Sequence, residues 1–136
     1  MTPGNIISLL TTAANSIDPG LPIYHGRRED LTLLYLNQFP QLHIIFVESF
    51  SGVPVQTNLT HTVLINYLSQ DRLDSTPDQW LPLVDNAYTF LYSFINELVN
   101  NFLQINGWRL LPVIKDLEGT VTGASLRLTI AAKLPC

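Results

Sequence analysis

Residues 76–104, TPDQWLPLVDNAYTFLYSFINELVNNFLQ, carry the longest helical pattern in the chain, and the predicted fold is built around it. Thr76, Pro77 and Gln79 match a capping box, with Thr as the N-cap, Pro at the first helical position and Gln reaching back to the cap. Pro82 leaves a second possibility open, in which a turn comes first and the regular helix begins at Pro82.

The polar residues of this helix fall on one narrow stripe at helical spacing. They are Asp85, Thr89, Ser93, Asn96, Glu97, Asn100 and Gln104. An ordinary surface helix shows an apolar face of about three residues in seven. Here apolar residues occupy most of the circumference of the helix, which predicts that most of it is buried. We therefore expect the helix to pack on a sheet and on something else, and to end at the C-cap Asn106–Gly107.

Two shorter helices are expected before it. Apolar residues recur at three- and four-residue spacing over residues 3–17, which predicts an N-terminal helix. Residues 21–26 are expected to be extended, because Pro22 biases its neighbour away from helix. Residues 28–38 predict a short second helix that Pro40 ends.

The remaining segments predict strands. Residues 41–47 and 60–68 are rich in β-branched and aromatic side chains and form a long hairpin, with residues 48–59 as its connection. Residues 108–115 and 125–131 predict a second hairpin, in which Pro112 marks an edge or a bulge and Gly123 a bulge. The prediction is a single α+β domain spanning residues 1–136, in which the long helix packs on a largely antiparallel sheet of about four strands.

Composition narrows the class of protein. The start of the chain lacks a basic n-region and a cleavage site, and no apolar run approaches the ~18 residues that span a bilayer, so a soluble intracellular domain is expected. Cys136 is the one cysteine, which excludes an intrachain disulfide and a cysteine-based zinc site.

Charge is the unusual feature of the composition. Seven basic and eleven acidic residues make 13% of the chain, against about 25%, or about 34 residues, in a typical domain of this length. One interpretation is that part of the surface is buried against other protein. The alternative is a monomer whose surface relies on amides and hydroxyls. A net charge of −4 argues against nucleic-acid recognition.

No pattern for catalysis, cofactor binding or metal binding is found. His25, His43 and His61 share no ligand spacing, although His43 and His61 lie on adjacent predicted strands and could face each other. Asp71 and Asp74 lie in a polar loop, where paired carboxylates are common on solvated turns. Trp80 and Trp108, at either end of the long helix, are expected to be core or interface anchors.

One charged cluster contrasts with this sparse background: Arg27, Arg28, Glu29 and Asp30 are consecutive. It is either a solvated loop whose acidic residues begin the next helix, or a polar anchor at a subunit interface, where arginine binds carboxylates in a bidentate manner. The residues leave both interpretations open.

The element order, together with YHGRREDLT leading into FPQLHIIFVES, the long helix and the closing LRLTIAAKLPC, resembles the tail terminator (tail completion) proteins of long-tailed bacteriophages. The resemblance spans most of the chain. It implies a non-enzymatic virion protein without cofactors, assembled in the host cytoplasm as a homo-oligomeric ring, typically a hexamer. That ring caps the tail tube, so its partners are the tail tube protein and the head or neck connector proteins.

The resemblance also makes residues 48–59 a candidate element facing the tube or the lumen, with Phe50, Val53, Gln56 and Asn58 as its candidate residues. A neck or head-completion ring protein is an alternative in the same class. A small hot-dog-like ligand-binding or enzyme domain is the alternative from a different class, because its sheet also wraps a long apolar helix.

Overall fold

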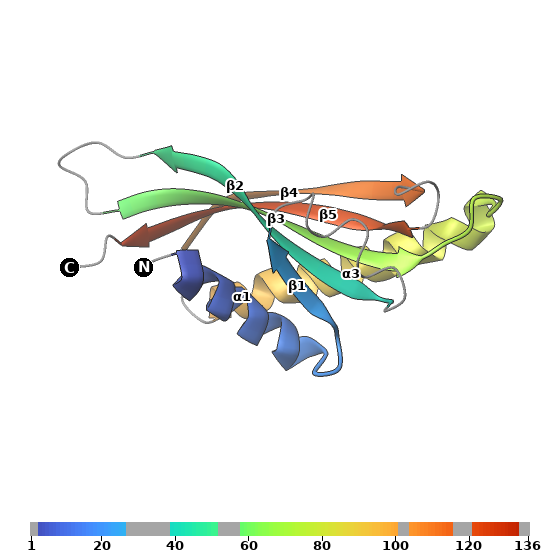
Figure 1. The fold of residues 1–136 in the computed structure, drawn as a ribbon, viewed down its shortest axis with the longest axis horizontal. Helices are drawn as coiled ribbons and strands as arrows, with labels where there is room; N and C mark the ends of the chain where they lie inside the picture. Colours follow the sequence, from blue (N-terminus) through green and yellow to red (C-terminus); the bar gives the residue numbers. More distant parts are fainter. Residues whose placement is uncertain (1–2, 27–38, 52–57, 101–103, 116–120, 134–136) are drawn as a thin grey trace.

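The computed structural model describes residues 3–26, 39–51, 58–100, 104–115 and 121–133 of the chain. Within these residues, five strands form one sheet and two helices lie on the same side of it (Figure 1). In chain order the elements are α1 (Pro3–Ile17), β1 (Ile23–Gly26), β2 (Gln41–Ser51), β3 (Asn58–Gln70), α3 (Pro77–Asn100), β4 (Gln104–Lys115) and β5 (Val121–Lys133).

The strand order in the sheet is β1-β2-β3-β5-β4. β1 runs parallel to β2, while the β2–β3, β3–β5 and β4–β5 pairs are antiparallel. The predicted α+β class, with one long helix on a largely antiparallel sheet, is confirmed. The sheet has one strand more than the expected four, because part of the segment 21–26, which was predicted only to be extended, pairs with β2 as strand β1. The short helix predicted over residues 28–38 lies outside the described residues.

The first hairpin is longer than predicted. β2 continues to Ser51 and β3 begins at Asn58, with a register shift between Val47 and Ser51. The expected connection over residues 48–59 is therefore wrong at both ends. Backbone hydrogen bonds do not depend on side-chain polarity, so pairing continues past Glu48, where the polarity of the sequence suggested an end.

The start of α3 resolves the two possibilities left by the sequence. The helix runs without interruption from Pro77 to Asn100, with Pro82 inside it. The Thr76 backbone N–H donates to Oε1 of Gln79 at 2.9 Å, and the Trp80 N–H donates to the Thr76 carbonyl at 3.0 Å. The cap thus holds the first turn ahead of the proline.

The predicted end of α3 is wrong. The helix ends at Asn100, and Asn106–Gly107 lies inside β4, where the register with β5 shifts between Ile105 and Gly107. Asn–Gly is found at strand irregularities as well as at helix C-caps. Local sequence does not separate the two cases.

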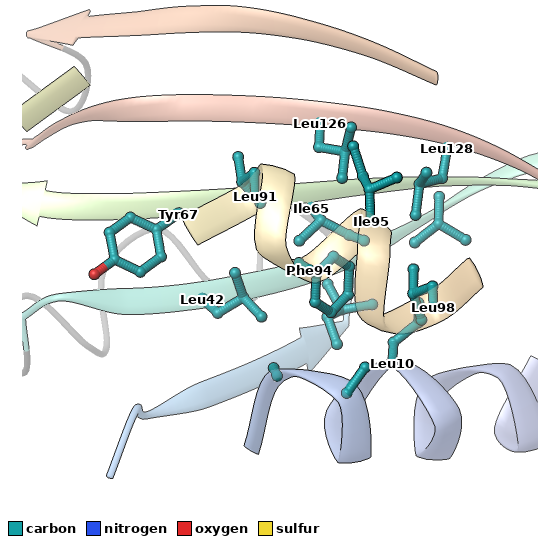
Figure 2. Packing of buried hydrophobic residues seen from close by; sticks show 14 of the residues in the cluster. Leu10, Leu42, Ile65, Tyr67, Leu91, Phe94, Ile95, Leu98, Leu126 and Leu128 are labelled. Atoms are coloured by element: carbon teal, nitrogen blue, oxygen red, sulfur yellow. The ribbon is translucent and has the colours of Figure 1, made fainter. Parts of the chain in front are cut away.

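The core lies between the helices and one face of the sheet. Figure 2 shows side chains from α1, α3 and the sheet converging around Phe94, which is fully buried. Tyr67 of β3 stacks on Phe90 of α3, with ring centroids 4.6 Å apart. The other buried contributors include Ile6, Leu10, Leu42, Ile44, Val63, Ile65, Leu91, Leu98, Leu126, Leu128 and Ile130.

Gly123 has a different role from the bulge predicted for it. The β3–β5 register is continuous from Asn58↔Lys133 to Gln70↔Val121, so Gly123 interrupts nothing. A Cβ at this position would overlap the carbonyl oxygen of Tyr67 and lie 2.9 Å from the carbonyl carbon of the same residue. Glycine here allows the backbones of β3 and β5 to approach closely.

We expect Leu91→Ala or Phe94→Ala to lower the free energy of unfolding by about 2–5 kcal/mol, because each removes a fully buried side chain and leaves a cavity. Asn96→Ala, on the exposed side of the same helix, serves as the control and changes stability by less than about 0.5 kcal/mol. Denaturant melts measure the difference, and the reverse ranking would contradict the orientation of α3.

Gly123→Ala is expected to destabilise the protein by about 1–3 kcal/mol, because the backbone of β3 must shift to admit the methyl group. Gly107→Ala is the matched control, since no atom lies within 4 Å of an added Cβ there. Equal effects of the two substitutions in thermal melts would show that the close approach at Gly123 is not tight.

Candidate functional site

The candidate residues from the sequence fall mainly outside the described part of the chain. Arg27, Arg28, Glu29 and Asp30 lie outside the described residues, as do Val53 and Gln56. Phe50 and Asn58 belong to β2 and β3, with the backbone placed in the sheet. In Figure 1 the ends of β2 and β3 that carry this connection extend beyond α1. Both candidate sites remain predictions.

An apolar strip on α3 is left uncovered by the sheet. The predicted polar stripe is confirmed for its helical positions from Asp85 to Asn100, which lie on the outside of the helix. At 100° per residue, Tyr88, Tyr92 and Val99 fall between this stripe and the buried arc. Tyr92 and Val99 are 49% and 55% exposed. The apolar surface of α3 is therefore wider than the surface the core uses.

This strip continues onto β4. The Trp108 ring makes an edge contact with Tyr92, with centroids 6.0 Å apart, and Tyr92 makes a similar contact with Tyr88 at 6.2 Å. Trp108 is 48% exposed, so it is not a core residue. We call this surface the α3–β4 ridge, and it comprises Leu81, Tyr88, Tyr92, Val99, Trp108 and Ile114.

The ridge lies beside an edge of the sheet. β4 pairs with β5 on one side and with no other strand in the described residues, so of the two roles predicted for Pro112, an edge or a bulge, the structure shows the edge. β4 has 12 residues, which is long for an edge, since edge strands are usually short, charged or covered. A long edge next to exposed aromatic rings is typical of a surface that contacts other protein.

The sheet face away from the helices, which we call the outer face, carries a pair of arginines. Arg109 of β4 is directly opposite Arg127 of β5, and both side chains are exposed. Like charges in this position are destabilising. Neither guanidinium makes an ion pair within the described chain. The sequence pattern did not predict this pair, although the sequences of β4 and β5 contain four basic residues and no carboxylate.

The other end of the outer face holds a buried histidine. His43 is 5% exposed, and its Nε2 lies 2.5 Å from Oε1 of Gln41, so the neutral ring donates this hydrogen bond. Tyr24 of β1 meets the ring edge-on at 6.1 Å. Burial lowers the pKa of His43 from 6.5 to about 4, because desolvation disfavours the charged imidazolium.

The expectation that His43 and His61 could face each other is wrong. His43 pairs with Asn66, five positions along β3 from His61, and an odd separation places two side chains on opposite faces of a sheet. His61 pairs with Ile130 on the helix side, where burial also lowers its pKa. The two histidines therefore form no joint site.

The carboxylates of the β3–α3 turn have structural contacts. Asp71 accepts a hydrogen bond from the Thr122 hydroxyl at 2.5 Å and from the Arg72 backbone N–H at 2.7 Å. Arg72 and Asp74 are 4.0 Å apart and largely exposed, a geometry worth little energetically. These contacts tie the turn to β5 and are consistent with the solvated turn expected there.

Signatures of several function classes are absent from the described chain. No three histidine, cysteine or carboxylate residues cluster there as metal ligands would. Neither described helix is long and apolar enough to cross a membrane. No family model matches the chain, and no curated protein matches it. The functional interpretation below is based on the α3–β4 ridge and the outer-face arginine pair.

Buried His43 makes stability depend on pH. Its folded pKa of about 4 lies below the ordinary 6.5, so its contribution is fully present above pH 6.5 and is lost as the pH falls toward 4. The loss amounts to at most about 3 kcal/mol. Between pH 7 and pH 4, wild type should lose more stability than His43→Gln in urea melts.

His25→Gln, at an exposed position of β1, is the control and should keep the wild-type pH profile. His61 contributes in the same direction, so His43→Gln removes only part of the pH dependence. Parallel profiles for wild type and His43→Gln would contradict the neutral, buried state of His43.

Proposed function

We propose that this chain is a structural virion protein that forms a homo-oligomeric ring, which caps the tail tube of a long-tailed bacteriophage and joins it to the head or neck. The proposal comes from the resemblance to tail terminator proteins in element order and in the sequence segments quoted above. The observation that carries it is the α3–β4 ridge, a row of exposed apolar side chains next to a long free strand edge. A neck or head-completion ring protein would use such a surface in the same way.

Assembly into a ring would remove a large part of the surface of each subunit from water. A stable interface buries about 800 Å² on each partner, and each subunit of a head-to-tail ring takes part in two such contacts. Together they would cover about a fifth of the 8034 Å² surface of the chain. A chain with only 13% charged residues is easier to keep soluble when a fifth of its surface is covered by other subunits.

The buried side of α3 favours a structural protein over a hot-dog-like ligand-binding or enzyme domain. Such a domain would be expected to project a polar side chain from the helix into a pocket. The seven buried residues of α3 are all apolar, from Val84 to Leu98. They fill a packed core, and α3 itself projects no buried polar side chain to orient a substrate.

Assembly of the purified chain tests the proposal. Sedimentation velocity and negative-stain electron microscopy, with the chain alone and with tail tubes, should detect closed rings. Tyr92→Lys should raise the concentration needed for half-assembly by at least about tenfold, because it places a charge in the centre of an apolar contact. Ser93→Lys adds the same charge to the polar side of the helix and should assemble as wild type does.

Circular dichroism should show both variants folded, since both positions are exposed. A wild-type chain that forms no ring at any concentration, with or without tail tubes, would contradict the proposed function. Equal assembly of the two lysine variants would exclude the ridge as the contact surface.

A further inference from the structure

The outer face of the sheet is covered by no described element where β4 and β5 form it. One row across this face consists of Leu64, Arg127 and Arg109, and the next contains Ser125 and Leu111. Arg109 and Arg127 are exposed, and Leu111 is 47% exposed. The outer face around these two rows is therefore exposed, with apolar side chains beside two adjacent positive charges.

The surface that would complement it lies on α3. Asp78 and Asp85 are exposed, and at 100° per residue they fall on one line, directly beside Tyr92 and the rest of the ridge. The exposed side of α3 thus combines an apolar row with an adjacent acidic row. The outer face of β4 and β5 offers apolar residues with arginines, which is the complementary pattern.

The dimensions of the two surfaces also agree. α3 has 24 residues, which corresponds to about 36 Å at 1.5 Å per residue. β4 has 12 residues, which corresponds to about 40 Å at 3.3 Å per residue. A helix of this length covers the open part of the sheet along its strands, as α3 already covers the other face within its own chain.

The two surfaces cannot meet within one molecule, because α3 packs on the face of the sheet opposite to the arginines (Figure 1). A contact between them therefore joins two copies through different patches. Such a heterologous contact leaves both patches free at the ends of each assembly, and it closes into a ring when the rotation between copies allows.

We propose that the exposed side of α3 in one copy docks on the outer face of β4 and β5 in the next, with Asp78 and Asp85 bound by Arg109 and Arg127. The inference rests on the proposed ring and names the contact that would build it. The opposed arginines, unfavourable in the isolated subunit, gain carboxylate partners on assembly, where guanidinium and carboxylate form charge-assisted hydrogen bonds.

Charge reversal on either side tests this contact. Arg109→Glu with Arg127→Glu, and Asp78→Lys with Asp85→Lys, should each raise the concentration for half-assembly by at least about tenfold in sedimentation velocity. Asn86→Glu with Ser93→Glu adds negative charge to the polar side of α3 and should assemble as wild type does. All substituted positions are exposed, so circular dichroism should show folded chains.

Mixing the two reversed variants gives the decisive result. In an alternating assembly, one contact pairs the introduced glutamates of the first variant with the introduced lysines of the second, and the following contact is wild type on both sides. An equimolar mixture should therefore recover assembly that neither variant shows alone. Failure of the mixture to recover, or normal assembly of either variant alone, would overturn the inference.

A neutral variant separates an assembly role from a structural one. Arg127→Thr removes the repulsion within the pair, so the melting temperature of the isolated chain should stay the same or rise while assembly weakens. A lowered melting temperature with unchanged assembly would overturn the inference. If the wild-type chain forms no rings under any condition, the proposed function fails, whereas rings that tolerate every charge change leave that function standing and exclude this contact alone.

Discussion

The apolar surface of α3 extends around more of the helix than one sheet face and α1 can cover, and the exposed surfaces of the molecule follow from this mismatch. Residues such as Leu91 and Phe94 are fully buried, while Tyr92, one position from Leu91, lies half exposed beside Trp108. Burying the exposed row within the same chain would require another layer next to the β4 edge, and the described chain supplies none.

The two faces of the sheet are covered unequally. Both described helices pack on one face, so the β4–β5 part of the outer face stays open and carries Arg109 opposite Arg127. An exposed apolar helix side is costly to leave in water, and the two opposed arginines repel each other. The carboxylates beside the helix side and the arginines have opposite charge, and their positions on opposite sides of the sheet allow contact only between copies.

Constraints inside the sheet keep these surfaces in place. Gly123 allows β5 to lie close against β3, and the continuous pairing of these strands fixes which side chains reach each face. The cap fixes the start of α3, and the hydrogen bond from Thr122 to Asp71 ties the β3–α3 turn to the start of β5. The ridge and the arginine pair are therefore presented on rigid elements, as a repeated contact between subunits requires.

The sequence by itself determined the α+β class and the polar stripe on α3, because both depend on local periodicity. It narrowed the start of that helix to the capping box or Pro82, and the role of Pro112 to an edge or a bulge. Only the tertiary structure decided that β1 joins the sheet, that Asn106–Gly107 lies in a strand, and that His43 and His61 occupy opposite faces. It alone placed Arg109 beside Arg127 and left Tyr92 exposed. Strand register and the area that one layer can cover arise from contacts between segments distant in the chain, which local patterns do not encode.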